Sequence, residues 1–153
     1  MRKGMEWVDL PPVWLIGHMV LAWSIGALMP PVIGEAGRLI GSTVGLAGVG
    51  LMVAAVVQMV ALRTTVIPRR TPSALVTTGV FGWSRNPIYL ADALILTGAI
   101  LWWDAVLALP LVASFVSVIT ARFIRDEEAR LTAAFGPEFD LWASLVRRWF
   151  GRR

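Results

Sequence analysis

The sequence predicts an all-α membrane protein: a polytopic helical bundle of about four transmembrane helices, followed by an amphipathic helix at the membrane interface. Three observations support this fold class. Hydrophobic residues make up 57% of the 153 residues and charged residues only 16%, whereas soluble domains usually have about 25% charged residues. Apolar runs of membrane-spanning length alternate with polar segments. All of the 14 Lys and Arg residues except Arg38 fall into segments that this arrangement places on one side.

Four apolar runs predict the spans. They cover approximately residues 13–32, 42–62, 88–103 and 105–123. A bilayer core needs about 20 apolar residues, and the first two runs reach that length. Pro30-Pro31 ends the first run without a small-residue cleavage pattern, so we expect a span there and not a cleaved signal peptide. The last two runs predict a tight helical hairpin with Trp102-Trp103-Asp104 at its turn.

A glycine repeat begins the second span. Gly37, Gly41 and Gly45 recur every four residues, which places them on one helix face where another helix can approach closely. We expect this face to pack against a helix, and it also offers a surface for an oligomer.

The C-terminal region predicts two further helical segments. Gly136-Pro137 ends the first segment and begins the second. From Glu138 onward, arginines accompany an apolar stripe, which is typical of a helix lying in the interface. The stripe consists of Phe139, Trp142, Leu145, Val146, Trp149 and Phe150. The whole chain, residues 1–153, has the length of a single domain.

The basic residues also predict the topology and limit the partners. Lys and Arg collect on the cytoplasmic side of membrane proteins, so we expect both termini in the cytoplasm and the protein in the cytoplasmic membrane. Anionic lipid accounts for basic residues beside apolar runs, and no nucleic acid is expected. The chain has no cysteine and one histidine, His18, which excludes disulfides, cysteine nucleophiles and multi-histidine metal sites. We expect no metal.

One cluster of candidate residues lies at the end of the polar segment 63–87. Arg85 stands directly before a membrane helix and Tyr89 just inside it. The alternative interpretation is an interfacial anchor pair, with arginine at the lipid phosphates and tyrosine at headgroup depth.

A second cluster is Asp126-Glu127-Glu128. Asp126 fits a solvated surface residue, because basic residues lie four positions before and after it. Glu127 and Glu128 share a helix face with apolar residues, where a carboxylate needs a partner or a ligand. A zwitterionic, cationic cofactor would supply one. The alternative is a pair of structural salt bridges to basic residues of the polar segment, Arg63, Arg69 or Arg70.

Three polar residues lie inside apolar runs: His18, Gln58 and Asp92. Intramembrane acids are usually functional, but Asp92 lies about one turn inside the boundary, where it can cap the helix or pair with Arg85 or Arg63. For His18 we expect a hydrogen bond to a neighbouring helix.

These segments together resemble the superfamily of isoprenylcysteine carboxyl methyltransferases and phospholipid N-methyltransferases. Its central signature is similar to Arg63-Thr-Thr-Val-Ile-Pro, Ala74-Leu-Val-Thr-Thr-Gly-Val-Phe and Ser84-Arg-Asn-Pro-Ile-Tyr-Leu. Its C-terminal signature is similar to Glu127-Glu128-x-x-Leu131, Phe135-Gly136 and Phe139-x-x-Trp142. The resemblance covers about residues 63–150, which it implies as the cofactor half. It is specific for the superfamily and not for the methyl acceptor.

The resemblance implies an S-adenosylmethionine-dependent methyltransferase. It implies a cofactor site formed by Val76, Gly79, Arg85, Asn86, Tyr89 and Glu128, and catalytic roles for Glu127, Glu128 and Arg85. The cofactor carries a carboxylate that suits an arginine, and an ammonium and ribose hydroxyls that suit a carboxylate. Two departures bear on the mechanism. The family often has His at Asn86, and Tyr at Phe139 and Trp142.

The implied acceptor is amphiphilic and resides in the membrane. The first candidate is the carboxylate of a prenylcysteine-like group or another small lipid-soluble molecule, and the alternative is a phospholipid amine. A different class, a non-enzymatic transporter or scaffold subunit, would place its charges at the bilayer midplane. This chain places them at one face instead.

Overall fold

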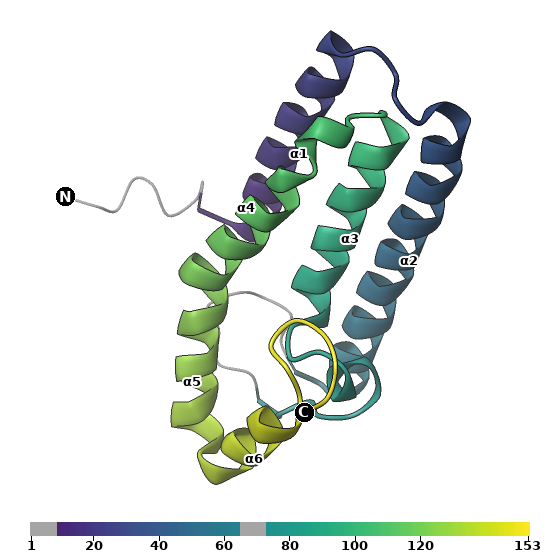
Figure 1. The fold of residues 1–153 in the computed structure, drawn as a ribbon. Coiled ribbons are helices and arrows are strands. Elements are labelled where there is room, and N and C mark those ends of the chain that lie inside the picture. Colours follow the sequence, from purple (N-terminus) through teal and green to yellow (C-terminus); the bar gives the residue numbers. More distant parts are fainter. Residues whose placement is uncertain (1–8, 65–72) are drawn as a thin grey trace, which may run out of the picture. The chain divides into compact units, whose positions relative to one another are not determined.

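The computed structural model describes residues 9–64 and 73–153, and the regular secondary structure in this part of the chain is helical, with one isolated β-bridge. In chain order the elements are α1 Pro11–Leu28, α2 Gly34–Ala61, the 3-10 helix η1 Gly79–Gly82, α3 Pro87–Trp102, the 3-10 helix η2 Val106–Ala108, α4 Pro110–Ile119, the π-helical turn η3 Thr120–Ile124, α5 Arg125–Phe135 and α6 Pro137–Leu145 (Figure 1). The predicted all-α class is confirmed. Part of the first signature segment, residues 65–68, lies outside the described residues.

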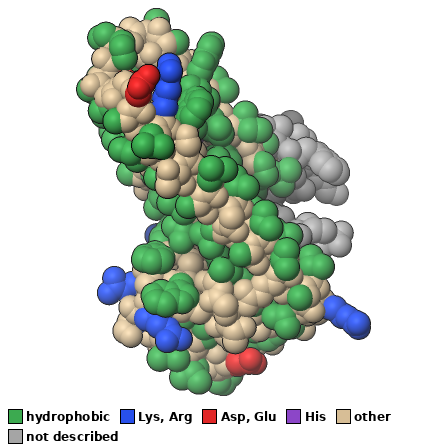
Figure 2. Space-filling view, turned by 90° about the vertical axis from the view of Figure 1, so that its right-hand side faces the viewer, with side chains coloured by type: hydrophobic (Ala, Val, Ile, Leu, Met, Phe, Trp, Pro, Cys, Tyr) green, Lys and Arg blue, Asp and Glu red, His purple; other side chains and the backbone are tan. Residues whose placement is uncertain are grey.

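The helices have the composition of membrane spans. Within residues 9–64 and 73–153, three are long and apolar enough to cross a bilayer: α1, α2 and the helical stretch Val106–Phe135. The third predicted span, α3, has 16 residues, or about 24 Å of helix against a hydrocarbon core of about 30 Å. Hydrophobic side chains cover much of the face in Figure 2, and Leu28 and Leu39 are 82% and 71% exposed. Such an apolar exterior requires lipid, so the chain is an integral membrane protein.

The chain forms two compact units. Unit 1 consists of Met1–Gly48 and Asp92–Ile119, and unit 2 consists of Val49–Ala91 and Thr120–Arg153. Every residue that the sequence predicts for the cofactor site or for catalysis belongs to unit 2.

In unit 1 the first part of α2 packs directly against α3. A Cβ atom on Gly41 would lie 2.5 Å from the Trp102 backbone nitrogen and 2.6 Å from the Gly98 carbonyl oxygen. A Cβ on Gly98 would lie 2.6 Å from the Gly45 backbone nitrogen. Only glycine allows two helix backbones to approach so closely. The predicted helix packing is confirmed. Atoms of α3 of the same chain lie against Gly37, Gly41 and Gly45, and the oligomer suggested through this face stays a prediction.

Asp104 joins the end of α3 to the start of α2. Its carboxylate accepts hydrogen bonds from the backbone N–H groups of Val32 at 3.0 Å, Ile33 at 3.0 Å and Gly34 at 2.7 Å. These bonds, led by that of Ile33, hold the pKa of Asp104 below its ordinary value. The carboxylate thus satisfies N–H groups that the start of a helix leaves without partners.

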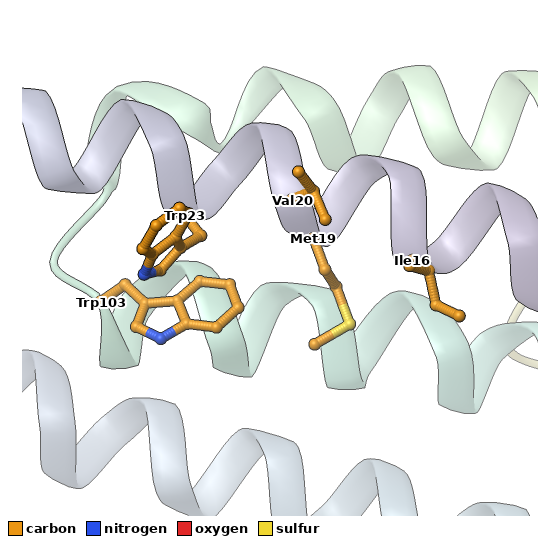
Figure 3. A pocket seen from close by; sticks show the side chains of 5 residues that line it. All are labelled: Ile16, Met19, Val20, Trp23 and Trp103. Carbon is orange, nitrogen blue, oxygen red and sulfur yellow. The ribbon is translucent and has the colours of Figure 1, made fainter.

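Helix α1 makes a polar contact with α4 and borders an apolar groove. His18 Nε2 lies 3.3 Å from Ser114 Oγ, the inter-helix hydrogen bond expected for this residue. The groove has a volume of about 310 Å³, and Figure 3 shows its lining by Ile16, Met19, Val20, Trp23 and Trp103. None of the predicted site residues borders it.

The core of unit 2 lies where α6 packs against the loop before α3. Its buried residues are Ala55, Val76, Phe81, Phe139, Trp142 and Val146. Trp142 Nε1 donates a hydrogen bond to the Phe81 carbonyl oxygen at 3.2 Å. The two C-terminal aromatic residues of the signature, Phe139 and Trp142, therefore stabilise this loop.

The C-terminal helix is shorter than predicted. Helix α6 ends at Leu145, Val146 is extended, and Val146 forms an antiparallel bridge with Arg152. We call residues 146–153 the C-terminal hairpin. Gly151, with φ of +98°, lies in the turn that this bridge closes. The predicted continuous stripe is thus divided: Phe139, Trp142 and Val146 are buried, whereas Leu145 and Phe150 are exposed.

Candidate functional site

Local structure places the first cluster of site residues. Ser84 is almost fully buried, and its Oγ accepts a hydrogen bond from the Asn86 N–H at 3.0 Å. This bond holds the backbone just before Pro87, the first residue of α3. The fixed φ of proline suits the first position of a helix. Arg85 therefore lies directly before α3, and Tyr89 lies in the first turn of α3.

Gln58 of α2 fixes the loop that carries Val76 and Gly79. Its Nε2 donates to the Thr78 carbonyl oxygen at 2.7 Å, and its Oε1 accepts from the Val80 N–H at 3.3 Å. Gly79 has φ of +56°, and a Cβ there would lie 2.5 Å from Gln58 Oε1. Both features require glycine. Sequence reasoning singled out Gln58 only as a polar residue in an apolar run and missed this role.

The carboxylates of α5 reach the residues at the start of α3. The Tyr89 hydroxyl donates to Glu127 Oε1 at 2.8 Å. Arg85 Nη2 lies 3.2 Å from Glu128 Oε1. Arg148 binds both oxygens of Glu128, with Nε to Oε1 at 3.0 Å and Nη2 to Oε2 at 2.6 Å. The predicted orientation of Glu127 and Glu128 toward this segment is confirmed.

The salt-bridge alternative holds for Glu128, but with other partners than expected. We expected Arg63, Arg69 or Arg70. The two arginines that bind Glu128 come from the start of α3 and from the C-terminal hairpin, and Arg69 and Arg70 lie outside the described residues. Asp126 is exposed, as predicted.

The anchor alternative for Arg85 and Tyr89 does not fit their burial. The Arg85 side chain is 9% exposed and Tyr89 is 6% exposed. Side chains that anchor a helix at the interface reach out to the lipid headgroups. These two residues instead bind carboxylates inside unit 2.

The electrostatics of the cluster leave Arg85 incompletely neutralised. Burial lowers the pKa of its guanidinium, Glu128 raises it, and the positive charges of Arg148 and Arg153 lower it further. The hydrogen bonds to Glu128 raise the pKa of Arg148. Both arginines are charged at neutral pH. The buried Arg85 Nε has no hydrogen-bond partner among the described residues.

Arg148 is the remaining member of the cluster, and its contact with Glu128 could not be predicted from the spacing of the two residues in the sequence. The two residues are 20 positions apart, and the predicted amphipathic helix left the direction of the terminal arginines open. Asn86 contributes to the same junction, because its Nδ2 donates to the Arg148 carbonyl oxygen at 3.0 Å.

The cluster suits a ligand that carries both charges. It combines two guanidinium groups, two carboxylates, a phenol and an amide. In the described part of the chain, no three His, Cys, Asp or Glu residues come together as a metal site requires.

One comparison with known proteins assigns the chain to a family. The family model described as phospholipid methyltransferase matches residues 38–138, about two thirds of the chain. No curated protein and no solved structure matches the chain. The matched range contains all the predicted site residues, from Val76 to Glu128. The chain therefore belongs to the phospholipid methyltransferase family and is a membrane methyltransferase.

Proposed function

We propose that this methyltransferase uses S-adenosylmethionine and methylates an amphiphilic acceptor that resides in the bilayer. The observation that carries the proposal is the buried Arg85 guanidinium. It keeps an unused donor at Nε, while the carboxylates of α5 lie beside Arg85 and Tyr89. A buried polar atom of this kind needs an acceptor, and the carboxylate of the cofactor fits it.

The remaining groups of the cluster fit the other parts of the cofactor. Glu127 accepts from the uncharged Tyr89 hydroxyl, so its negative charge stays available for an ammonium or sulfonium group. Glu128 lies beside it and contributes a second carboxylate. Further proposed contacts come from Asn86, Tyr89 and the backbone around Val76 and Gly79. Asn86 can hydrogen-bond but cannot act as a titrating base.

Methyl transfer requires the side chains mainly to align the acceptor with the methyl group. When bound, S-adenosylmethionine supplies a methyl group on a positively charged sulfur. A carboxylate acceptor loses no proton, so alignment with the methyl group provides most of the acceleration. An amine acceptor must lose a proton, and the Glu127 carboxylate is the group of this cluster suited to take it.

Two acceptor classes fit the site. The first is the carboxylate of a prenylcysteine-like group or of another small lipid-soluble molecule. The second is a phospholipid amine, which the description of the matching family favours. A non-enzymatic transporter or scaffold role has no such support, because the chain belongs to a methyltransferase family.

A transfer assay tests the proposal and separates the acceptors. The full chain in lipid nanodiscs receives S-adenosylmethionine with a labelled methyl group, together with phosphatidylethanolamine or a farnesylated cysteine analogue. Methyl esters release volatile labelled methanol in mild alkali, whereas N-methyl groups do not. We expect labelled product with one of the two acceptors. Absence of labelled product, together with absence of S-adenosylmethionine binding in isothermal titration, would contradict the proposal.

A further inference from the structure

The C-terminal hairpin is fastened to the segment that carries Arg85. The Arg85 N–H donates to the Arg147 carbonyl oxygen at 3.1 Å, and the Gly151 N–H donates to the Trp83 carbonyl oxygen at 2.7 Å. These two backbone bonds hold the hairpin against the residues just before α3. Its side chains therefore have fixed positions relative to the proposed cofactor site.

Arg148, which lies in the hairpin, makes more contacts with the Glu128 carboxylate than Arg85 does. Arg148 uses two nitrogen atoms on the two oxygens of the carboxylate, whereas Arg85 makes one contact at 3.2 Å. Bidentate arginine–carboxylate pairs are the more directional and the stronger kind. The bond from Asn86 Nδ2 to the Arg148 carbonyl oxygen also holds the backbone at this position.

We propose that Arg148 is a positioning residue: it holds Glu128 in a single-contact arrangement with Arg85 and so preserves the capacity of Arg85 to bind the anionic group of the cofactor. The inference rests on the proposed function. Two guanidinium groups share the one charge of Glu128, so the trio Arg85, Glu128 and Arg148 keeps an excess positive charge. That excess, together with the unused Arg85 Nε, attracts a carboxylate.

Loss of Arg148 has a specific consequence in this arrangement. Glu128 would turn fully onto Arg85, bind it through both oxygens and occupy its unused donor. Arg85 would then be neutralised within the protein, and the cofactor carboxylate would have to displace Glu128. Lysine at position 148 would restore the charge but not the planar two-nitrogen contact.

Isothermal titration of the full chain in detergent, with S-adenosylmethionine and with S-adenosylhomocysteine, tests the inference. We expect Arg148→Gln to weaken binding of both by at least about tenfold, and Arg148→Lys to fall between this variant and the wild type. The control is Arg147→Gln, whose side chain is exposed and whose backbone bond to Arg85 is unaffected by the substitution. It should bind as the wild type does.

A double variant separates positioning from simple destabilisation. In the E128Q background the charge that would neutralise Arg85 is already gone, so E128Q/R148Q should bind both compounds as tightly as E128Q alone. A merely structural role of Arg148 would lower the affinity by the same factor in both backgrounds. Wild-type affinity in R148Q overturns the inference, and so does a double variant that binds at least about tenfold more weakly than E128Q. Wild type that binds neither compound contradicts the proposed function itself, and the two failures are thereby distinguished.

Discussion

Arg85 combines two properties that are unusual for an arginine at the start of a membrane helix: its side chain is 9% exposed, and its buried Nε has no partner among the described residues. We expect Arg85→Ala to weaken S-adenosylmethionine binding by about 10- to 150-fold, because a charge-assisted contact contributes roughly 1.5–3 kcal/mol. Isothermal titration measures the change. Arg147→Ala, with an exposed side chain on the neighbouring hairpin, is the control. Equal titration curves for the two variants would support a purely structural Arg85.

The acidic cluster gives a second prediction for single residues. Glu127→Gln and Glu128→Gln keep the size of the side chain and remove its charge. At least one of them should lose methyl transfer while the protein stays folded. Asp126→Asn should stay active, because Asp126 is exposed and an exposed helix pair contributes only about 0.3–0.5 kcal/mol. Full activity in both glutamine variants would remove α5 from the proposed site.

Asp104 predicts a pH dependence of stability. Its pKa lies below the ordinary value of 3.8, first because of the hydrogen bond from Ile33. A carboxylate with a lowered pKa stabilises the fold above its ordinary pKa, and this stabilisation is lost as the pH falls through the lowered value. The melting temperature of the wild type should therefore exceed that of Asp104→Asn at neutral pH, and the difference should shrink below pH 3.8. A difference that stays constant under strong acid would disprove this role.

At the scale of elements, the close contact between α2 and α3 depends on glycines of both helices. Gly41→Ala would place a Cβ 2.5 Å from the Trp102 nitrogen, so the helices must separate. We expect a loss of unfolding free energy of about 1–3 kcal/mol, the usual cost of overpacking. Gly17→Ala in α1, whose Cβ would meet nothing within 4 Å, is the matched control and should be neutral or stabilising. Denaturant unfolding in detergent measures both.

Hydrophobic patterning predicted most of the elements because each span is a local property of the chain. The ends of the helices differ from the ends of the predicted apolar runs where polar side chains bind the backbone. Helix α2 begins at Gly34, eight residues before the predicted run, because Asp104 binds the N–H groups there. Helix α6 ends at Leu145, and the residues after it form backbone hydrogen bonds with Trp83 and Arg85, which are distant in the sequence and so are not predicted by local patterning.

For the candidate site, too, the sequence predicted features within one helix but not contacts between elements. Helical periodicity correctly placed Glu127 and Glu128 on the face toward Arg85 and Tyr89. Periodicity along one helix says nothing about a side chain from another element. The contact of Arg148 with Glu128 and the support of Gly79 by Gln58 were therefore beyond the reach of the sequence.

At the scale of the whole molecule, the distribution of Lys and Arg predicts the topology. The chain has no cysteine, so a single introduced cysteine reports one position. With both termini in the cytoplasm, a cysteine at the exposed Arg38 should react with an impermeant reagent outside intact cells. A cysteine at the exposed Asp140 should react only after the membrane is opened. The opposite pattern of labelling would reverse the proposed orientation.

The junction between Asn86 and the hairpin also has a consequence for biogenesis. The hydrogen bond from Asn86 to Arg148 joins positions 62 residues apart, and ribosomes add about 5–20 residues per second. Roughly 3–12 s of translation therefore separate the two partners. By the end of that interval α3 and α4 have been synthesised, whereas Glu128 and Arg148 are added only after both helices. A nascent chain arrested before the hairpin would therefore carry its apolar spans without the complete polar cluster.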